Sequence, residues 1–184
     1  MMRTICRLVV SCTLFLLPAR VQGTVLVPAS MAELARDAGA IVRGRVVAAE
    51  ARFTPDRGAI ETLVTVDAER TLKGSLGTTV QFLVPGGTLG RYRSIFVGAP
   101  ELVVGQRVVV FLGWHGPSYP YLLGFSQGVF RVQADGQRGW LVTPPPIPVP
   151  ATGTSTVVRG DPDRRPMPLA DFEQRVRDLV AGTR

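Results

Sequence analysis

The chain has 184 residues, 46% of them hydrophobic, which is enough for one compact domain with a substantial core. Its formal net charge of +7 is carried almost entirely by arginine, since Lys73 is the one lysine, and no run of like charges marks a surface for nucleic acid or lipid. One histidine, His115, and two cysteines leave few side chains for metal or redox chemistry.

Residues 1–23 have the pattern of an export signal. Two arginines precede an apolar core at 8–17, and slim residues at Val21 and Gly23 stand three and one positions before a cleavage point. The core is shorter than the roughly 20 apolar residues that cross a bilayer, so a retained anchor is the less favoured alternative. A lipoprotein signal at Cys12 is rejected because the apolar run continues past that cysteine.

Cleavage after Gly23 would leave a mature chain that begins at Thr24 and has no cysteine. Arg3, Arg7 and Arg20 would leave with the signal, so the net charge would fall by three, from +7 to +4. The protein is therefore expected in the periplasm or the medium, with no disulfide, no cofactor, no bound metal and no membrane insertion after processing.

Two helices are expected to flank the domain. Ser30 and Glu33 form a capping-box pattern that predicts a short helix, ending near Gly39. Residues 169–181 have an apolar stripe along one face and predict an amphipathic helix that packs back on the domain. Residues 144–168 contain eight prolines and predict an extended linker before that helix.

Strand-like runs lie between the helices, separated by glycine and proline turns. In the first run Val42, Gly44, Val46 and Ala48 alternate on one face. In the second the alternation fails at Arg70, which predicts a β-bulge before Leu72. The expected strands are 41–50, 60–72, 78–84, 107–114, 121–125, 129–132 and 139–142.

Short strands at even spacing favour an all-β architecture. For residues 24–143 the expected fold is a five- to six-stranded antiparallel OB-like barrel with the short N-terminal helix and the C-terminal amphipathic helix at its flanks. The run 107–114 is apolar on both faces, so it is the expected central strand. The long glycine-rich insertion 86–104 is expected to form a flexible loop.

Six short motifs carry a resemblance to known proteins: residues 40–46, 72–74, 84–87, 98–100, 104–112 and 123–132. Their order resembles a family of exported bacterial domains of unknown function, some of which lie upstream of matrixin-like metalloproteases; the resemblance covers residues 30–135 and, loosely, the last helix. More distantly, residues 38–112 resemble the netrin-like module of tissue inhibitors of metalloproteinases, a five-stranded OB barrel. The resemblance implies the fold but not the inhibitory mechanism, because those inhibitors chelate zinc with an amino-terminal cysteine and Thr24 cannot.

The expected ligand-facing surface combines the glycine-rich insertion with basic and aromatic side chains. Arg91, Tyr92, Arg93 and Phe96 follow Gly86-Gly87-Thr88-Leu89-Gly90, and neither a helix N-terminus nor a Walker lysine accompanies these glycines, so a phosphate cradle is not indicated. Arg43 and Arg45 on the first strand are expected to add to the same surface.

Catalytic signals are weak. The letters of Gly124-Phe125-Ser126-Gln127-Gly128 match a nucleophile elbow, but a strand follows them where the elbow needs a helix. His115 lies in a predicted turn, and Asp67 and Glu69 share one strand face as surface charge, so no catalytic residue and no metal ligand is assigned.

The sequence therefore predicts an exported, non-enzymatic binding module whose partner is a protein, a peptide or a glycan. Two alternatives remain open: a protease-associated or protease-inhibitor-like netrin-type domain, and a serine hydrolase that uses Ser126 and His115. A nucleic-acid partner is not expected, and the oligomeric state is left undetermined.

Overall fold

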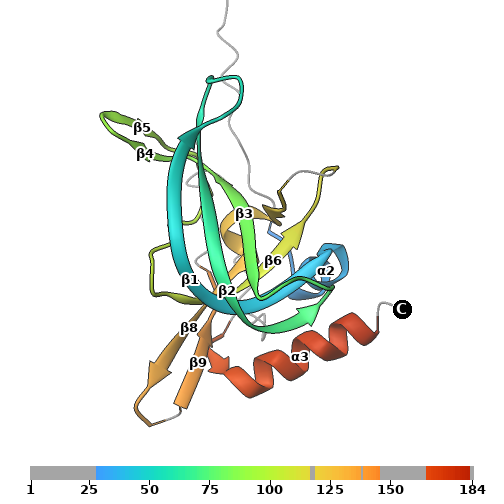
Figure 1. The fold of residues 1–184 in the computed structure, drawn as a ribbon. Coiled ribbons are helices and arrows are strands. Elements are labelled where there is room, and N and C mark those ends of the chain that lie inside the picture. The colour runs from blue at the N-terminus through green and yellow to red at the C-terminus, as the bar shows by residue number, and fades with distance from the viewer. Residues whose placement is uncertain (1–27, 117–118, 138, 146–164, 183–184) are drawn as a thin grey trace, which may run out of the picture.

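The computed structural model describes residues 28–116, 119–137, 139–145 and 165–182 (Figure 1). The predicted signal, residues 1–23, lies outside the described residues, as does most of the predicted linker, 146–164. The described chain is mostly β, with 48% in strands, a short N-terminal helix and a C-terminal helix, which confirms the predicted class. No helix among the described residues is long and apolar enough to cross a membrane.

The elements follow one another along the chain as two α-helices, one 3₁₀ helix and ten strands within the described ranges. Their bounds are α2 (Met31–Asp37), β1 (Ala40–Phe53), β2 (Ile60–Lys73), β3 (Thr79–Pro85), β4 (Gly87–Leu89), β5 (Tyr92–Ser94), β6 (Arg107–Gly113), β7 (Tyr121–Leu122), η2 (Phe125–Gly128), β8 (Val129–Asp135), β9 (Gly139–Thr143), β10 (Met167–Pro168) and α3 (Leu169–Ala181).

Five strands close into a ring. They follow the order β1-β2-β3-β7-β6, and β6 pairs again with the beginning of β1. Neighbouring strands are antiparallel except β3 and β7, which are parallel at Leu83 and Tyr121, so the predicted wholly antiparallel sheet is corrected at this pairing. From β6 the sheet continues outside the ring through β8, β9 and β10.

Three bulges interrupt the pairing of β1 with β2. Two lie on β2, where Glu69 and Leu72 have no partner in the register, and they confirm the predicted irregularity on that strand. The third, at Val47 on β1, was not predicted. It reverses the alternation, so Ala49 and Ala51, and not Ala48, continue the inner face after Val46.

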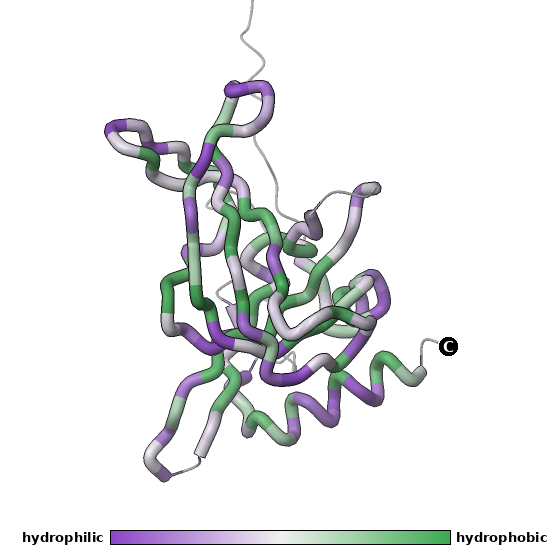
Figure 2. The backbone as a smooth tube through the Cα atoms, viewed as in Figure 1, coloured by the Kyte–Doolittle hydropathy of each residue, from purple (hydrophilic) through white to green (hydrophobic). Residues whose placement is uncertain are grey.

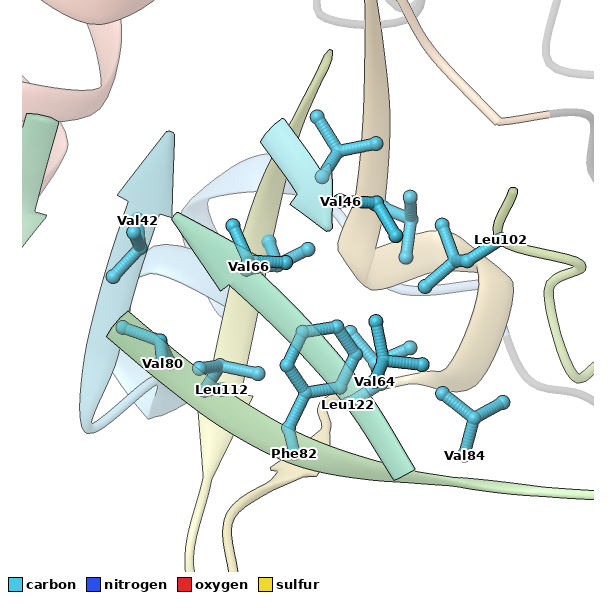
Figure 3. Close-up of a cluster of buried hydrophobic side chains, with 13 residues drawn as sticks. Val42, Val46, Val64, Val66, Val80, Phe82, Val84, Leu102, Leu112 and Leu122 are labelled. Atoms are coloured by element: carbon cyan, nitrogen blue, oxygen red, sulfur yellow. The ribbon is translucent and has the colours of Figure 1, made fainter. Parts of the chain in front are cut away.

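Strand β6 separates two hydrophobic cores. Val108, Val110 and Leu112 face the interior of the ring, whose valine-rich packing is drawn in Figure 3. Val109 and Phe111 face the opposite way, toward the helices. The prediction of a central strand is thereby confirmed, because all five side chains are buried. In Figure 2 hydrophobic stretches lie along these inner strands, while hydrophilic ones lie at several turns and along α3.

The second core lies between the sheet and both helices. Phe130 on β8 packs against Phe111, with ring centroids 5.5 Å apart, and against Phe172 on α3 at 5.0 Å. Leu34 of α2 and Val176 of α3 belong to the same buried cluster. Helix α3 therefore lies against the ring wall below β1 and β2 (Figure 1), fixed by aromatic packing.

Helix α2 is closed at both ends by side chains. At its start the Ser30 hydroxyl accepts from the Glu33 amide, and the Glu33 carboxylate accepts from the Ser30 amide at 2.7 Å, which completes the predicted capping box. At its end the Lys73 ammonium donates to the carbonyls of Ala35 and Arg36. The single lysine thus connects the end of β2 to the end of the helix.

The capping box makes the stability of α2 depend on acid pH. Donation from the Ser30 amide, and then from its hydroxyl, lowers the pKa of Glu33 below its ordinary value. The resulting stabilisation is present above the pKa of Glu33 in the unfolded chain and is lost as the pH falls through the folded-state pKa. We expect Glu33→Gln, which removes the titrating carboxylate, to flatten the loss of stability between neutral pH and about pH 3, measured by denaturant titration at each pH. Ser30→Ala removes the hydroxyl but keeps the backbone amide, so it is expected to flatten the loss less. An unchanged slope in Glu33→Gln would contradict this.

Three elements differ from the sequence-based expectations. The insertion 86–104, expected as a loop, contains the hairpin β4–β5. The expected strand 121–125 ends at Leu122, because Gly124 and Phe125 have φ values of 64° and 55° and turn the chain into η2. At the end of the predicted linker, Met167 and Pro168 form β10 beside β9.

Candidate functional site

A cleft of about 440 Å³ opens at one end of the ring. Its floor is formed by the inner faces of β1 and β2 beyond the Val47 bulge, and its walls by the β4–β5 hairpin and the loop that follows it. The lining residues are Ala49, Ala51, Thr62, Val64, Val84, Pro85, Gly86, Gly87, Thr88, Arg93, Ser94, Ile95, Phe96, Ala99, Pro100, Glu101 and Leu102.

Two glycines place the hairpin across the face of β2. The Gly86 amide donates to the Ile60 carbonyl at 2.8 Å, and the Thr62 hydroxyl donates to the Gly86 carbonyl at 2.7 Å. At Gly87, φ is +143° and a Cβ would lie 2.6 Å from the Thr62 hydroxyl oxygen. Only glycine fits this close approach, so the Gly-Gly pair directs the hairpin over the floor of the cleft.

The loop from Ile95 to Leu102 is held in place by η2. The Ser126 amide donates to the Gly98 carbonyl at 2.8 Å, and the rings of Phe96 and Phe125 pack with centroids 5.1 Å apart. Phe125 adopts a positive φ, a conformation that costs a non-glycine residue on the order of 1–2 kcal/mol. The fold therefore fixes Phe96 on the cleft wall, while Ile95 beside it stays 76% exposed.

Of the six residues predicted to face a ligand, two line the cleft and two stand next to it. Arg93 and Phe96 belong to the lining. Tyr92 lies at the hairpin, 50% exposed, with its ring 6.1 Å edge-on from that of Phe53. The Arg91 guanidinium covers the ring of Tyr92 at 5.0 Å. The hairpin therefore presents one aromatic ring and two arginines beside a cavity of mixed polarity.

Arg43 and Arg45 are not part of this cleft, and the prediction that they share its surface is corrected. Arg43 turns toward α3, where its guanidinium donates to the buried carboxylate of Glu173 at 2.5 Å. Its Nε lies 3.3 Å from a carboxylate oxygen of Glu69, without the alignment of a hydrogen bond. Arg45 is exposed on the outer face of β1, opposite Asp67. The reason is the strand alternation, which directs both side chains away from the ring interior.

The cleft is lined by side chains of both charges. Arg93 and Glu101 are the charged side chains of its lining. Among the described residues no carboxylate lies within ion-pair distance of Arg93 or Arg91. A cavity lined by both apolar and polar groups, with guanidinium groups at its edge that have no carboxylate partner among the described residues, favours a ligand that joins an apolar side chain to a negative charge.

Four residues on the floor of the cleft were not predicted to face a ligand: Ala49, Ala51, Thr62 and Val64. Alanine has no pattern that marks it as ligand-facing, and the bulge at Val47 moved the inner face by one residue. Glu101 and Leu102 were also missed, because they lie in the turn-rich end of the insertion.

A smaller cavity of about 280 Å³ lies on the other side of the segment Ala99–Glu101. Ser126 and Arg131 line it, and the Arg131 guanidinium donates to the Glu101 carbonyl at 3.4 Å. His115 does not line this cavity. Its imidazole ring stacks on the ring of Tyr121, with the two centroids 4.3 Å apart. Within the described ranges no hydrogen bond joins Ser126 to His115 or either of them to a carboxylate.

Metal-ligating side chains do not gather in the described part of the chain, where no group of three or more His, Cys, Asp or Glu residues could hold an ion. Comparison with protein-family models, with curated proteins and with solved structures finds no significant match.

Proposed function

We propose that the protein is an exported binding module that holds an apolar side chain of a protein or peptide partner in the cleft beside β4–β5. The observation that carries the proposal is the position of Ile95 and Phe96, two apolar side chains kept at a cavity wall that is open to solvent. Exposed apolar groups beside a concave surface are typical of interaction sites.

The proposed architecture behind this site is an OB-like barrel. The closed five-strand ring, the valine-rich interior and the open mouth at the cleft support it. Export is proposed from the pattern of residues 1–23, and it favours a protein, peptide or glycan partner of the periplasm or the medium.

The test compares partner capture by two variants that differ in where a charge is placed. Ile95→Asp puts a carboxylate on the cleft wall, whereas Val104→Asp puts one on an apolar residue of similar exposure, 59%, outside the lining. We expect envelope proteins retained by the wild type and by Val104→Asp to be lost, on the order of tenfold or more, with Ile95→Asp. A partner set that both variants retain equally would contradict the proposal.

A protease-associated role is a second candidate, and one observation favours it. The Ala29 amide donates to the buried Gln127 side chain at 2.8 Å, next to the Ser126–Gly98 hydrogen bond. The first described residues are thus fixed beside the cleft loop, as an inhibitory ridge would require. Titration of the purified protein into a secreted zinc endopeptidase tests it: dose-dependent loss of peptide cleavage would support the role, and unchanged cleavage would contradict it.

A further inference from the structure

The two arginines of the β4–β5 hairpin differ from those on the neighbouring sheet. Arg43, Arg52 and Arg107 each pair with a glutamate. Arg91 and Arg93 are exposed, and within the described ranges neither has an acidic side chain at ion-pair distance. The hairpin projects past β1 in Figure 1, so these two positive charges are accessible to a partner at the cleft.

The guanidinium of Arg91 is held in position by its surroundings. Gly90, with φ of 59°, begins the two-residue turn between β4 and β5 and so fixes the backbone beside it. The Arg91 side chain donates to the Tyr92 hydroxyl at 2.8 Å and lies over the Tyr92 ring, which in turn meets Phe53 edge-on. Its remaining N–H donors can bind a ligand with little further loss of conformational freedom.

The same contacts favour a peptide over a base or a sugar. A base stacks on the open face of an aromatic ring, and Arg91 already covers one face of Tyr92. On the loop that follows β5 the most exposed apolar side chains are aliphatic, Ile95 at 76% and Val97 at 67%. Aliphatic surface beside a guanidinium fits the apolar and acidic side chains of a polypeptide.

The distance between the apolar and the charged group sets the spacing in the partner. Arg93 and Ile95 line the cleft two residues apart, so their Cα atoms are at most about 7 Å from each other. An extended peptide advances about 3.3 Å per residue. An acidic side chain one or two positions from the apolar residue in the cleft therefore comes within reach of Arg93. Glu101, farther along the lining loop, disfavours an acid on its own side.

We propose that the partner of the cleft is an acidic peptide segment. Its apolar residue enters the cavity beside Ile95, and an aspartate or glutamate within two positions of that residue accepts hydrogen bonds from Arg93 and Arg91. This inference rests on the proposed function and deepens it by giving the charge and the spacing of the recognised segment.

Selection of phage-displayed random peptides on the purified protein tests the inference. We expect the selected peptides to carry aspartate or glutamate within two positions of an aliphatic or aromatic residue more often than the unselected library does. Changing that acid to its amide in one selected peptide is expected to weaken binding on the order of tenfold, measured by fluorescence anisotropy. Binding should also weaken between about 0.1 M and 1 M salt, because the charge pair is exposed to solvent.

The matched variants reverse one charge inside the lining and one outside it. Arg93→Glu is expected to bind the acidic peptide on the order of tenfold more weakly than the wild type, and to prefer the same peptide with lysine in place of the acid. Arg165→Glu makes the same change at an exposed arginine outside the lining and is expected to leave both affinities unchanged. Circular dichroism checks that each variant is folded.

The acidic partner and the apolar cleft are overturned by different results. Peptides that Ile95→Asp weakens, but that are not enriched in acids or that bind Arg93→Glu as well as the wild type, would overturn the acidic partner alone. So would equal weakening by Arg93→Glu and Arg165→Glu, which would indicate attraction by net charge only. If no selected peptide depended on Ile95, both proposals would be wrong.

Discussion

Arg43→Ala is expected to lower the free energy of unfolding by about 3 kcal/mol, measured by denaturant titration, because it removes one partner of a buried ion pair. The carboxylate of Glu173 is 4% exposed and lies between β1, β2 and α3. Arg43 donates to one of its oxygens at 2.5 Å and Arg70 approaches the other at 2.9 Å. Without Arg43 the buried carboxylate keeps, among the described residues, Arg70, which is more exposed, and Arg177 at 3.8 Å.

The matched control is Arg45→Ala, on the same strand two residues along. Arg45 is exposed and has no ion pair among the described residues, so its loss is expected to change the unfolding free energy by less than about 0.5 kcal/mol. A double-mutant cycle with Glu173→Ala should give a coupling of roughly 1–3 kcal/mol for Arg43. If Arg43→Ala lowered the free energy of unfolding no more than Arg45→Ala does, the ion pair would not stabilise the docking of α3.

The second large effect is expected at Gly44, in the middle of β1. A Cβ at this position would lie 2.2 Å from the Asp67 carbonyl oxygen and 2.5 Å from a methyl group of Val66. The nearest of these atoms is backbone on the neighbouring strand, so relief requires the two strands to separate next to the bulge at Glu69. We expect Gly44→Ala to cost about 3 kcal/mol or more of unfolding free energy, at the upper end of the range for overpacked cores.

Gly77→Ala provides the control for Gly44→Ala. Nothing lies within 4 Å of a Cβ at Gly77, which is exposed before β3. The same chemical change there is expected to leave stability within about 0.5 kcal/mol of the wild type, or to raise it slightly by restricting the unfolded chain. Equal thermal and denaturant midpoints for the two variants would show that β1 and β2 tolerate a wider spacing at this point.

Local signals in the sequence were sufficient for several elements. The capping box of Ser30 and Glu33 depends on residues three apart, and the strand 107–113 is apolar on both faces, so neither needs information from distant parts of the chain. The hairpin β4–β5 was missed because its strands are three residues each and have no alternation to read. Short strands of this kind form when the surrounding structure holds them, here through Ile60 and Thr62.

The residues of the candidate site could be predicted from the sequence only in part. Arg93 and Phe96 stand out in the sequence as charged and aromatic residues after a glycine-rich turn, and both line the cleft. The role of Arg43 could not be predicted, because Glu173 lies 130 residues away and only the folded chain brings them together. The floor residues Ala49 and Ala51 depended on a bulge that alternation alone does not reveal.

The position of β6 has a consequence for how the protein unfolds. Its valines and its phenylalanine belong alternately to the interior of the ring and to the layer beneath the helices. Loss of that strand would expose both apolar layers to water in one event, so we expect the two layers to unfold together. Ring and helices are thus expected to behave as a single cooperative unit of folding.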